Sequence, residues 1–137
     1  MKPLLSILFL TITLQLQAQS RESSSLTINF NSSQHQLSST AQNKLSKALQ
    51  SINPNNIIRI ALIGHTDNDG EITYNQKLSE RRSQATLSFL LKAGVSKDRI
   101  ETYSKGEVEP KADNATKAGQ AINRRVEITI IYESMPQ

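Results

Sequence analysis

Ile57-Ile58-Arg59-Ile60-Ala61-Leu62-Ile63 runs directly into Gly64-His65-Thr66-Asp67, and this stretch decides how the chain folds. Its first part is rich in β-branched residues and almost continuously apolar, which predicts an interior strand covered on both faces or most of them. Asp67 comes just past the carboxyl end of that strand, where open α/β sheets place their ligand crevices. Asp67 is therefore our first candidate for a binding residue.

The segments on either side of this strand alternate between strand and helix patterns. Apolar residues occupy every second position in residues 26–30 and 126–132, as in half-buried strands. They recur at helical spacing in residues 39–52, where Ser39 or Thr40 could cap a helix. The predicted order is a strand at 26–30, a helix at 39–52, a strand at 57–63, a loop at 66–73, a long helix closed by Gly94, a short strand at 100–104, a surface loop at 105–120 with room for one helical turn, and a strand at 126–132. This order predicts an α/β two-layer sandwich, with two helices on one mixed sheet.

Length and composition exclude several classes of protein. The 137 residues, 36% hydrophobic and 20% charged, suffice for one small domain. The 16 Lys and Arg against 12 Asp and Glu give a formal net charge of +4, but these charges are scattered, which argues against nucleic-acid binding. The chain has no cysteine, so a disulfide framework and a lipid-modified cysteine are excluded. We expect no cofactor, and too few suitably spaced ligands accompany His65 for a metal site.

Residues 1–18 have the pattern of a signal peptide. Lys2 supplies a positive start, the stretch from Leu4 to Leu16 is almost wholly apolar, and Ala18 suits a signal peptidase. As a helix, this stretch spans about 20 Å, short of a hydrocarbon core of roughly 30 Å, so an uncleaved membrane anchor fits less well. We expect cleavage after Ala18, a polar lead-in at 19–25, one domain at 26–133, a tail at 134–137, and no transmembrane segment in the mature chain.

Arg82 breaks the rules of its predicted helix. At about 100° per residue it shares the apolar stripe of Leu78 and Phe89, which must face the sheet. With Ser79 as the N-cap, Arg82 would lie in the first turn, where the helix dipole favours anions. Free N–H groups and a guanidinium together could grip a carboxylate there, while Asp67 could take an ammonium group. The pair suits a free amino-acid end, which carries both charges on one carbon.

Each of these residues also has a purely structural interpretation. Asp67 and Gly70 could form a tight turn, and Asp67 could simply pair with Arg82 as an internal salt bridge. Asn75 could cap a helix, and Arg124 could belong to a solvated sheet edge. If the site is a binding site, removing Arg82 should weaken binding without unfolding the domain.

Several spaced motifs resemble those of the OmpA-like (OmpA/MotB C-terminal) domain. The likeness runs from about Leu26 to Tyr132 and rests on Gly64-His65-Thr66-Asp67, Asn75, Leu78-Ser79-Glu80-Arg81-Arg82-Ser83, Gly106, Pro110 and Asn123-Arg124-Arg125-Val126-Glu127-Ile128. The resemblance implies a βαβαββ sandwich that binds peptidoglycan noncovalently and holds the diaminopimelate of the stem peptide. The site residues it implies are Asp67 for the ammonium, Arg82 for the carboxylate, Asn75 and Arg124 lining the pocket, Thr66 beside it, and Ser33 approaching through its main chain. Ser83 and Asn31 depart from the usual alanine and aspartate of the family.

The resemblance also implies a location in the periplasm, in association with peptidoglycan and through a possible protein partner with the outer membrane. Two other functions stay open. In a protein-interaction module of an envelope complex, the loop at 105–120 would recognise the partner. In a cell-wall hydrolase, His65 would be the base, but no serine or cysteine elbow accompanies it, so we expect that the protein is not an enzyme.

Overall fold

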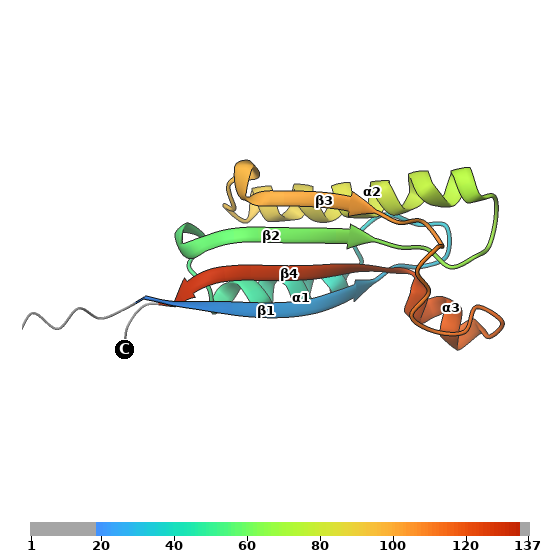
Figure 1. The fold of residues 1–137 in the computed structure, drawn as a ribbon, viewed down its shortest axis with the longest axis horizontal. Helices are drawn as coiled ribbons and strands as arrows, with labels where there is room; N and C mark the ends of the chain where they lie inside the picture. The colour runs from blue at the N-terminus through green and yellow to red at the C-terminus, as the bar shows by residue number, and fades with distance from the viewer. Residues whose placement is uncertain (1–18, 135–137) are drawn as a thin grey trace, which may run out of the picture.

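Four strands and three α-helices form residues 19–134, which are the residues that the computed structural model describes (Figure 1). The expected signal peptide and residues 135–137 of the expected tail lie outside them. The strands are β1 (Ser20–Asn29), β2 (Ile57–Gly64), β3 (Ile100–Ser104) and β4 (Arg125–Ser134). The helices are α1 (Ser39–Gln50), α2 (Ile72–Lys92) and α3 (Lys117–Asn123), with 3-10 turns at Pro54–Asn56 and Lys97–Arg99.

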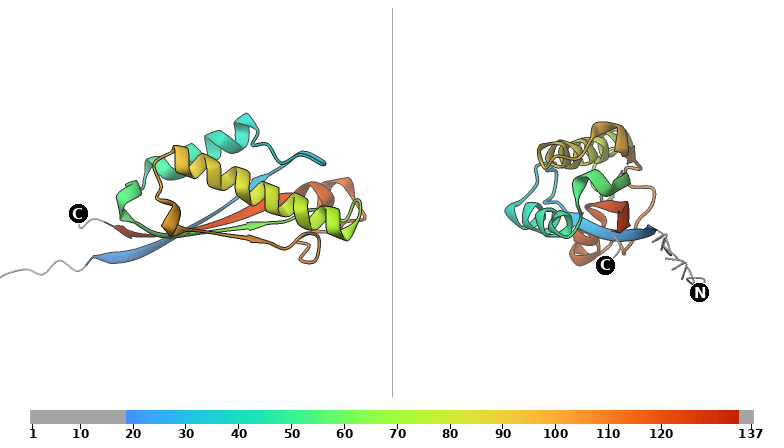
Figure 2. Two further views of the ribbon diagram at one scale, coloured as in Figure 1. Left: turned by 90° about the horizontal axis from the view of Figure 1, so that it is seen from above. Right: turned by 90° about the vertical axis from the view of Figure 1, so that its left-hand side faces the viewer.

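The strands form one mixed sheet in the order β1-β4-β2-β3. β4 pairs antiparallel with both β1 and β2, whereas β2 and β3 are parallel. α1 and α2 lie side by side on one face of this sheet, and α3 lies at one end of it (Figures 1 and 2). The predicted α/β two-layer sandwich is confirmed. The helix α3 begins in the last part of the loop expected at 105–120 and continues to Asn123. Only one helical turn was expected in this loop.

β1 is longer than its hydrophobic alternation indicated. It begins at Ser20, so the residues expected as a lead-in are paired with the end of β4, from Ser20 opposite Ser134 onward. Ser134, expected in the tail, is likewise the last residue of β4. Side-chain alternation stops at Leu26, but the backbone ladder continues because main-chain pairing does not require a buried side chain.

The expectation that β2 is covered on both faces is wrong. β2 is an interior strand, but both main helices cover the same face of the sheet (Figure 2). Ile60 and Leu62 are fully buried on this face. Arg59, the neighbour of Ile60 in the strand, is exposed. Ala61 and Ile63 are half-buried on the open face, and their apolar side chains hide the alternation in the sequence.

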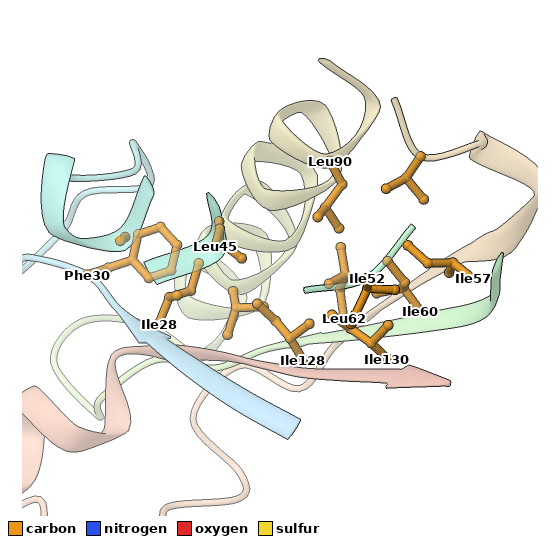
Figure 3. Close-up of a cluster of buried hydrophobic side chains, with 13 residues drawn as sticks. Ile28, Phe30, Leu45, Ile52, Ile57, Ile60, Leu62, Leu90, Ile128 and Ile130 are labelled. Carbon is orange, nitrogen blue, oxygen red and sulfur yellow. The ribbon is translucent and has the colours of Figure 1, made fainter. Parts of the chain in front are cut away.

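The core lies between the sheet and the two helices. Leu45 of α1 and Leu90 of α2 pack against isoleucines and a leucine of the central strands (Figure 3). Each such side chain contributes about 1.5–3 kcal/mol when it is fully buried. The other members of the cluster are Ile28, Phe30, Ala41, Ile52, Ile57, Ile60, Leu62, Val95, Val126, Ile128 and Ile130.

The N-caps of the two main helices differ from the expected ones, although α1 begins at Ser39 as expected. Ser38, not Ser39 or Thr40, caps α1, because its side chain accepts from the N–H of Ala41. α2 begins at Ile72, and Glu71 is its N-cap residue. Ser79 therefore lies inside the helix, where its hydroxyl donates to the carbonyl of Gln76. The helix starts earlier than its apolar stripe suggests.

Gly64 is required where β2 passes under α2. A Cβ atom at this position would lie 2.1 Å from the carbonyl oxygen of Ser79 and 2.6 Å from Oγ of Ser83. Gly94, by contrast, has a φ of 94° and no atom within 4 Å of an added Cβ, so only its backbone conformation favours glycine.

We therefore expect Gly64→Ala to lower the free energy of unfolding by at least about 3 kcal/mol, because β2 and α2 must move apart. Gly94→Ala is the matched control, which should cost about 1–2 kcal/mol through its backbone alone. Urea unfolding followed by circular dichroism measures both values. Equal losses in the two variants would contradict the close approach of β2 to α2.

Candidate functional site

Arg82 lies in the middle of α2, and its guanidinium is buried under the loop that follows β1. Nε donates to the carbonyl of Gln34 at 2.8 Å, Nη1 to that of His65 at 3.0 Å and Nη2 to that of Asn31 at 3.2 Å. The residue has 0% of its surface exposed, and its Cζ lies 5.2 Å from the centre of the Phe30 ring. The expected place in the first turn of the helix is wrong, because contacts beyond the apolar stripe extend α2 back to Ile72.

Burial changes the electrostatics of this guanidinium. Desolvation lowers the pKa of Arg82 to about 10, and the charge of Arg124 acts in the same direction, whereas that of Asp67 opposes it. Arg82 therefore remains protonated at neutral pH. Of the five N–H donors of an arginine, three are used by carbonyls, which leaves two for another acceptor.

Asp67 pairs with Arg124 and not with Arg82. Its Oδ2 lies 3.1 Å from Nη1 of Arg124, and its Oδ1 accepts from the N–H of Asp69 at 3.2 Å. The second contact is an Asx turn, so the predicted turn at Asp67 exists, with Gly70 at a φ of 90°. The internal salt bridge that we considered between Asp67 and Arg82 is absent from the described part of the chain, because the cation facing Asp67 comes from the start of β4.

Arg124 points into the molecule, so the alternative that it belongs to a solvated sheet edge is wrong. Its side chain is 18% exposed, and Nε donates to the carbonyl of Phe30 at 2.9 Å. Its main chain closes α3 through a bond to Gln120. The ends of β1, β2 and β4 thus meet at Arg124.

Asn75 and Thr66 bring buried acceptors to the same end of the sheet. Asn75 is not the cap of α2; its Nδ2 donates to Glu107 at 2.6 Å, and its Oδ1 has no partner. Oγ1 of Thr66 also lacks a partner, and the Thr66 N–H donates to the carbonyl of Gly106. Glu107 was missed from the sequence, because nothing in a polar loop indicates which acid reaches the helix.

Ser33 lies in the loop that covers Arg82. It has a φ of 57°, and the turn around it is closed by a bond from the N–H of Gln34 to the carbonyl of Asn31. These two residues supply two of the three carbonyls that Arg82 binds. The main chain of this loop, rather than its side chains, therefore builds the site.

His65 is buried and neutral. Desolvation by burial lowers its pKa to about 4, helped by the charge of Arg125 and opposed by those of Glu127 and Glu109. Neither ring nitrogen makes a hydrogen bond, since Nε2 is 3.7 Å from the carboxylate of Glu127. His65 is therefore not the hydrogen-bonded histidine that such a position usually holds.

Within residues 19–134, no group of three or more histidine, aspartate and glutamate side chains could hold a metal ion. No helix in this range is long and apolar enough to cross a membrane.

The fold and the site define a small α/β binding domain whose polar residues gather at one end of its sheet. The chain belongs to the OmpA family, because residues 29–124 match the sequence profile of that family. This confirms the resemblance that its motifs indicate.

Known proteins with similar chains carry this domain in longer sequences. The outer-membrane lipoprotein YfiB of Pseudomonas aeruginosa is 38% identical over 104 residues, which cover 76% of this chain and 62% of YfiB. The peptidoglycan-binding protein ArfA of Mycobacterium tuberculosis is 43% identical over 72 residues, covering 53% of this chain and 22% of ArfA. This chain therefore spans less than two thirds of either relative.

Among solved structures, the cell wall anchor of the T6SS from Pseudomonas aeruginosa has a similar fold. It superimposes with a TM-score of 0.66 at 28% sequence identity, over 84% of this chain and 88% of that one.

His65 makes the stability of the domain depend on pH. The histidine titrates at 6.5 unperturbed and at about 4 in the folded chain, so between these values the unfolded chain binds the additional proton. The stability that depends on a neutral His65 is fully present above about pH 6.5 and is lost as the pH falls towards 4. Between pH 7 and 4 we expect the wild type to lose about 3 kcal/mol more than His65→Leu, which cannot titrate there. Urea unfolding measures both free energies. Equal losses of stability in the two proteins would show that folding does not lower the pKa of His65.

The structure revises the expectation that Arg82 can be removed without harm to the fold. Arg82→Ala leaves three carbonyls without their donor and empties the space beside Phe30, so we expect it to cost at least about 3 kcal/mol. Arg81→Ala removes the exposed neighbouring arginine and should change stability by no more than about 0.5 kcal/mol. Thermal unfolding compares the two. A melting temperature of Arg82→Ala equal to that of Arg81→Ala would refute the anchoring role.

Proposed function

We propose that the protein binds peptidoglycan noncovalently through the diaminopimelate of the stem peptide, with Asp67 taking the ammonium and Arg82 the carboxylate. The observation that carries this proposal is the gathering of one carboxylate, one deeply buried guanidinium and two unpartnered acceptors at the end of β2. In the zwitterion of an amino-acid end, the ammonium and the carboxylate are attached to the same carbon atom. A site for it needs an acid and a base in one crevice.

The ammonium end has several acceptors available. An ammonium group donates three hydrogen bonds, and a charge-assisted bond to a carboxylate is the strongest of them. Asp67 would supply the charge, and the oxygens of Thr66 and Asn75 are the unpartnered acceptors near it. Because Glu107 holds the amide nitrogen of Asn75, the amide presents its oxygen to the site. This arrangement favours a cation over a second carboxylate at that position.

The carboxylate end would use the two unspent donors of Arg82. A planar guanidinium binds a carboxylate in two-pronged fashion, which fixes the orientation of the ligand. The loop around Ser33 covers this guanidinium, so binding requires that loop to shift and Arg124 to share Asp67 with the ligand. Ser33 then lies where its main chain would meet the stem peptide.

The relatives support a binding role at the cell wall. ArfA is named as a peptidoglycan-binding protein, YfiB as an outer-membrane lipoprotein, and the structural neighbour as a cell wall anchor. We infer a binding module of the periplasm that is not an enzyme. Within residues 19–134 neither ring nitrogen of the buried, neutral His65 has a hydrogen-bond partner, which fits that inference. A partner in the outer membrane remains part of the proposal.

Sedimentation with purified sacculi tests the proposal. The wild type should pellet with the sacculi. Asp67→Asn should bind at least about tenfold more weakly, since it loses a charged hydrogen bond. The matched control is Asp69→Asn, which removes an exposed acid of the same loop and should pellet like the wild type. The melting temperature of each variant, measured in parallel, separates lost binding from lost folding.

Competition with small molecules identifies the ligand group. Free meso-diaminopimelate should release the bound protein, whereas pimelate, which has the same carboxylates and no ammonium, should not. If Asp67→Asn pellets as well as the wild type, or if both competitors act alike, the zwitterion site is wrong.

A further inference from the structure

A cavity of about 320 Å³ lies beside the proposed site, between the end of β1 and the first turns of α1. Seven polar residues line it: Thr27, Asn29, Asn31, Ser38, Thr40, Lys44 and Arg124. Of the residues discussed for the diaminopimelate site, Phe30, Asn31 and Arg124 also line the cavity, whereas Thr66, Asp67, Asn75 and Arg82 do not. The cavity is therefore a neighbouring space and not the same one.

The charged side chains of this cavity are both cations. Lys44 and Arg124 line it, and no aspartate or glutamate is among its lining residues. Lys44 donates to the carbonyl of Thr27 at 2.6 Å, which leaves two of its three N–H donors. Among residues 19–134 no carboxylate lies within 4.0 Å of Lys44, so its charge is not neutralised by the protein. Because Arg124 is paired with Asp67, the exposed ammonium of Lys44 is the cation of this lining that remains available to an anion.

Arg124 connects this cavity to Asp67. Its Nη1 lies 3.1 Å from Oδ2 of Asp67, while the same side chain forms part of the cavity wall. Arg124 and Lys44 bind the carbonyls of Phe30 and Thr27, which are three residues apart at the end of β1 and therefore separated by roughly 10 Å. An extended peptide covers this distance in about three residues, so a carboxylate elsewhere in a peptide held at Asp67 can reach Lys44.

We propose that this cavity is a second subsite, which binds another carboxylate of the stem peptide through the ammonium of Lys44. The inference rests on the proposed function and deepens it. Two groups of a stem peptide have this chemistry: the free α-carboxylate of a γ-linked glutamate that precedes diaminopimelate, and the terminal carboxylate of an alanine that follows it. Lys44 would then select stem peptides in which this carboxylate is not amidated.

Calorimetric titration of the purified protein with soluble peptides tests the subsite. One pair is the alanyl-γ-glutamyl-diaminopimelate tripeptide and the same tripeptide with its glutamate α-carboxylate amidated. A second pair is the tetrapeptide ending in D-alanine and its C-terminal amide. The wild type should prefer the free acid of one pair by about three- to tenfold, the effect of one charge-assisted hydrogen bond, and the pair that shows the preference identifies the carboxylate.

Lys44→Gln should abolish this preference. Lys47→Gln is the matched control, because Lys47 is an exposed lysine of the same helix that does not line the cavity, and it should keep the wild-type preference. If the wild type binds acid and amide alike, or if Lys44→Gln retains the preference, the subsite is refuted while the diaminopimelate site stands. If the wild type binds none of the peptides, the proposed function fails, and the subsite fails with it.

Discussion

The buried guanidinium of Arg82 holds together three segments that are far apart in the sequence. Through it, α2 is joined to the loop after β1 and to the carbonyl of His65 at the end of β2. A buried charge is tolerated only when its donors are satisfied, so the carbonyls of Asn31 and Gln34 are as necessary as the arginine. The same cation that gives the site its positive charge also fixes the shape of the loop that covers it.

A second set of contacts fixes the other wall of the site. The segment after β3 is held between β2 and α2, because Thr66 donates to the carbonyl of Gly106 and the N–H of Gly106 donates to Ser79. Glu107, the next residue, thereby reaches Asn75. The loop has no periodic sequence pattern, but hydrogen bonds to β2 and α2 hold its first residues in place. This explains why α2 begins at Ile72, well before its apolar stripe.

The amino-acid sequence predicted the architecture and the gathering of polar residues better than it predicted their partners. Alternation and helical spacing are local properties, so β2, α1, β3 and β4 could be located from them. The partner of Asp67 could not, because Arg124 comes from the junction of α3 and β4, 57 residues farther along the chain. The predicted loop end at residue 73 is close to the observed start of α2 at Ile72, but the choice of Ser79 as the N-cap was wrong. Residues 104–107 contact the first turns of α2 through Gln76 and Ser79, and no local pattern indicates these contacts. The family motifs indicated these residues together but not which of them touch.

The two ends of the described chain lie together, because Ser20 at the start of β1 is opposite Ser134 at the finish of β4 (Figure 1). The polar site is at the other end of the same strands, about 30 Å away for ten-residue strands. Any tether attached at either terminus would leave the site free to face outward. The sheet would then act as a rigid spacer that sets the distance between an attachment point and the ligand proposed for the site.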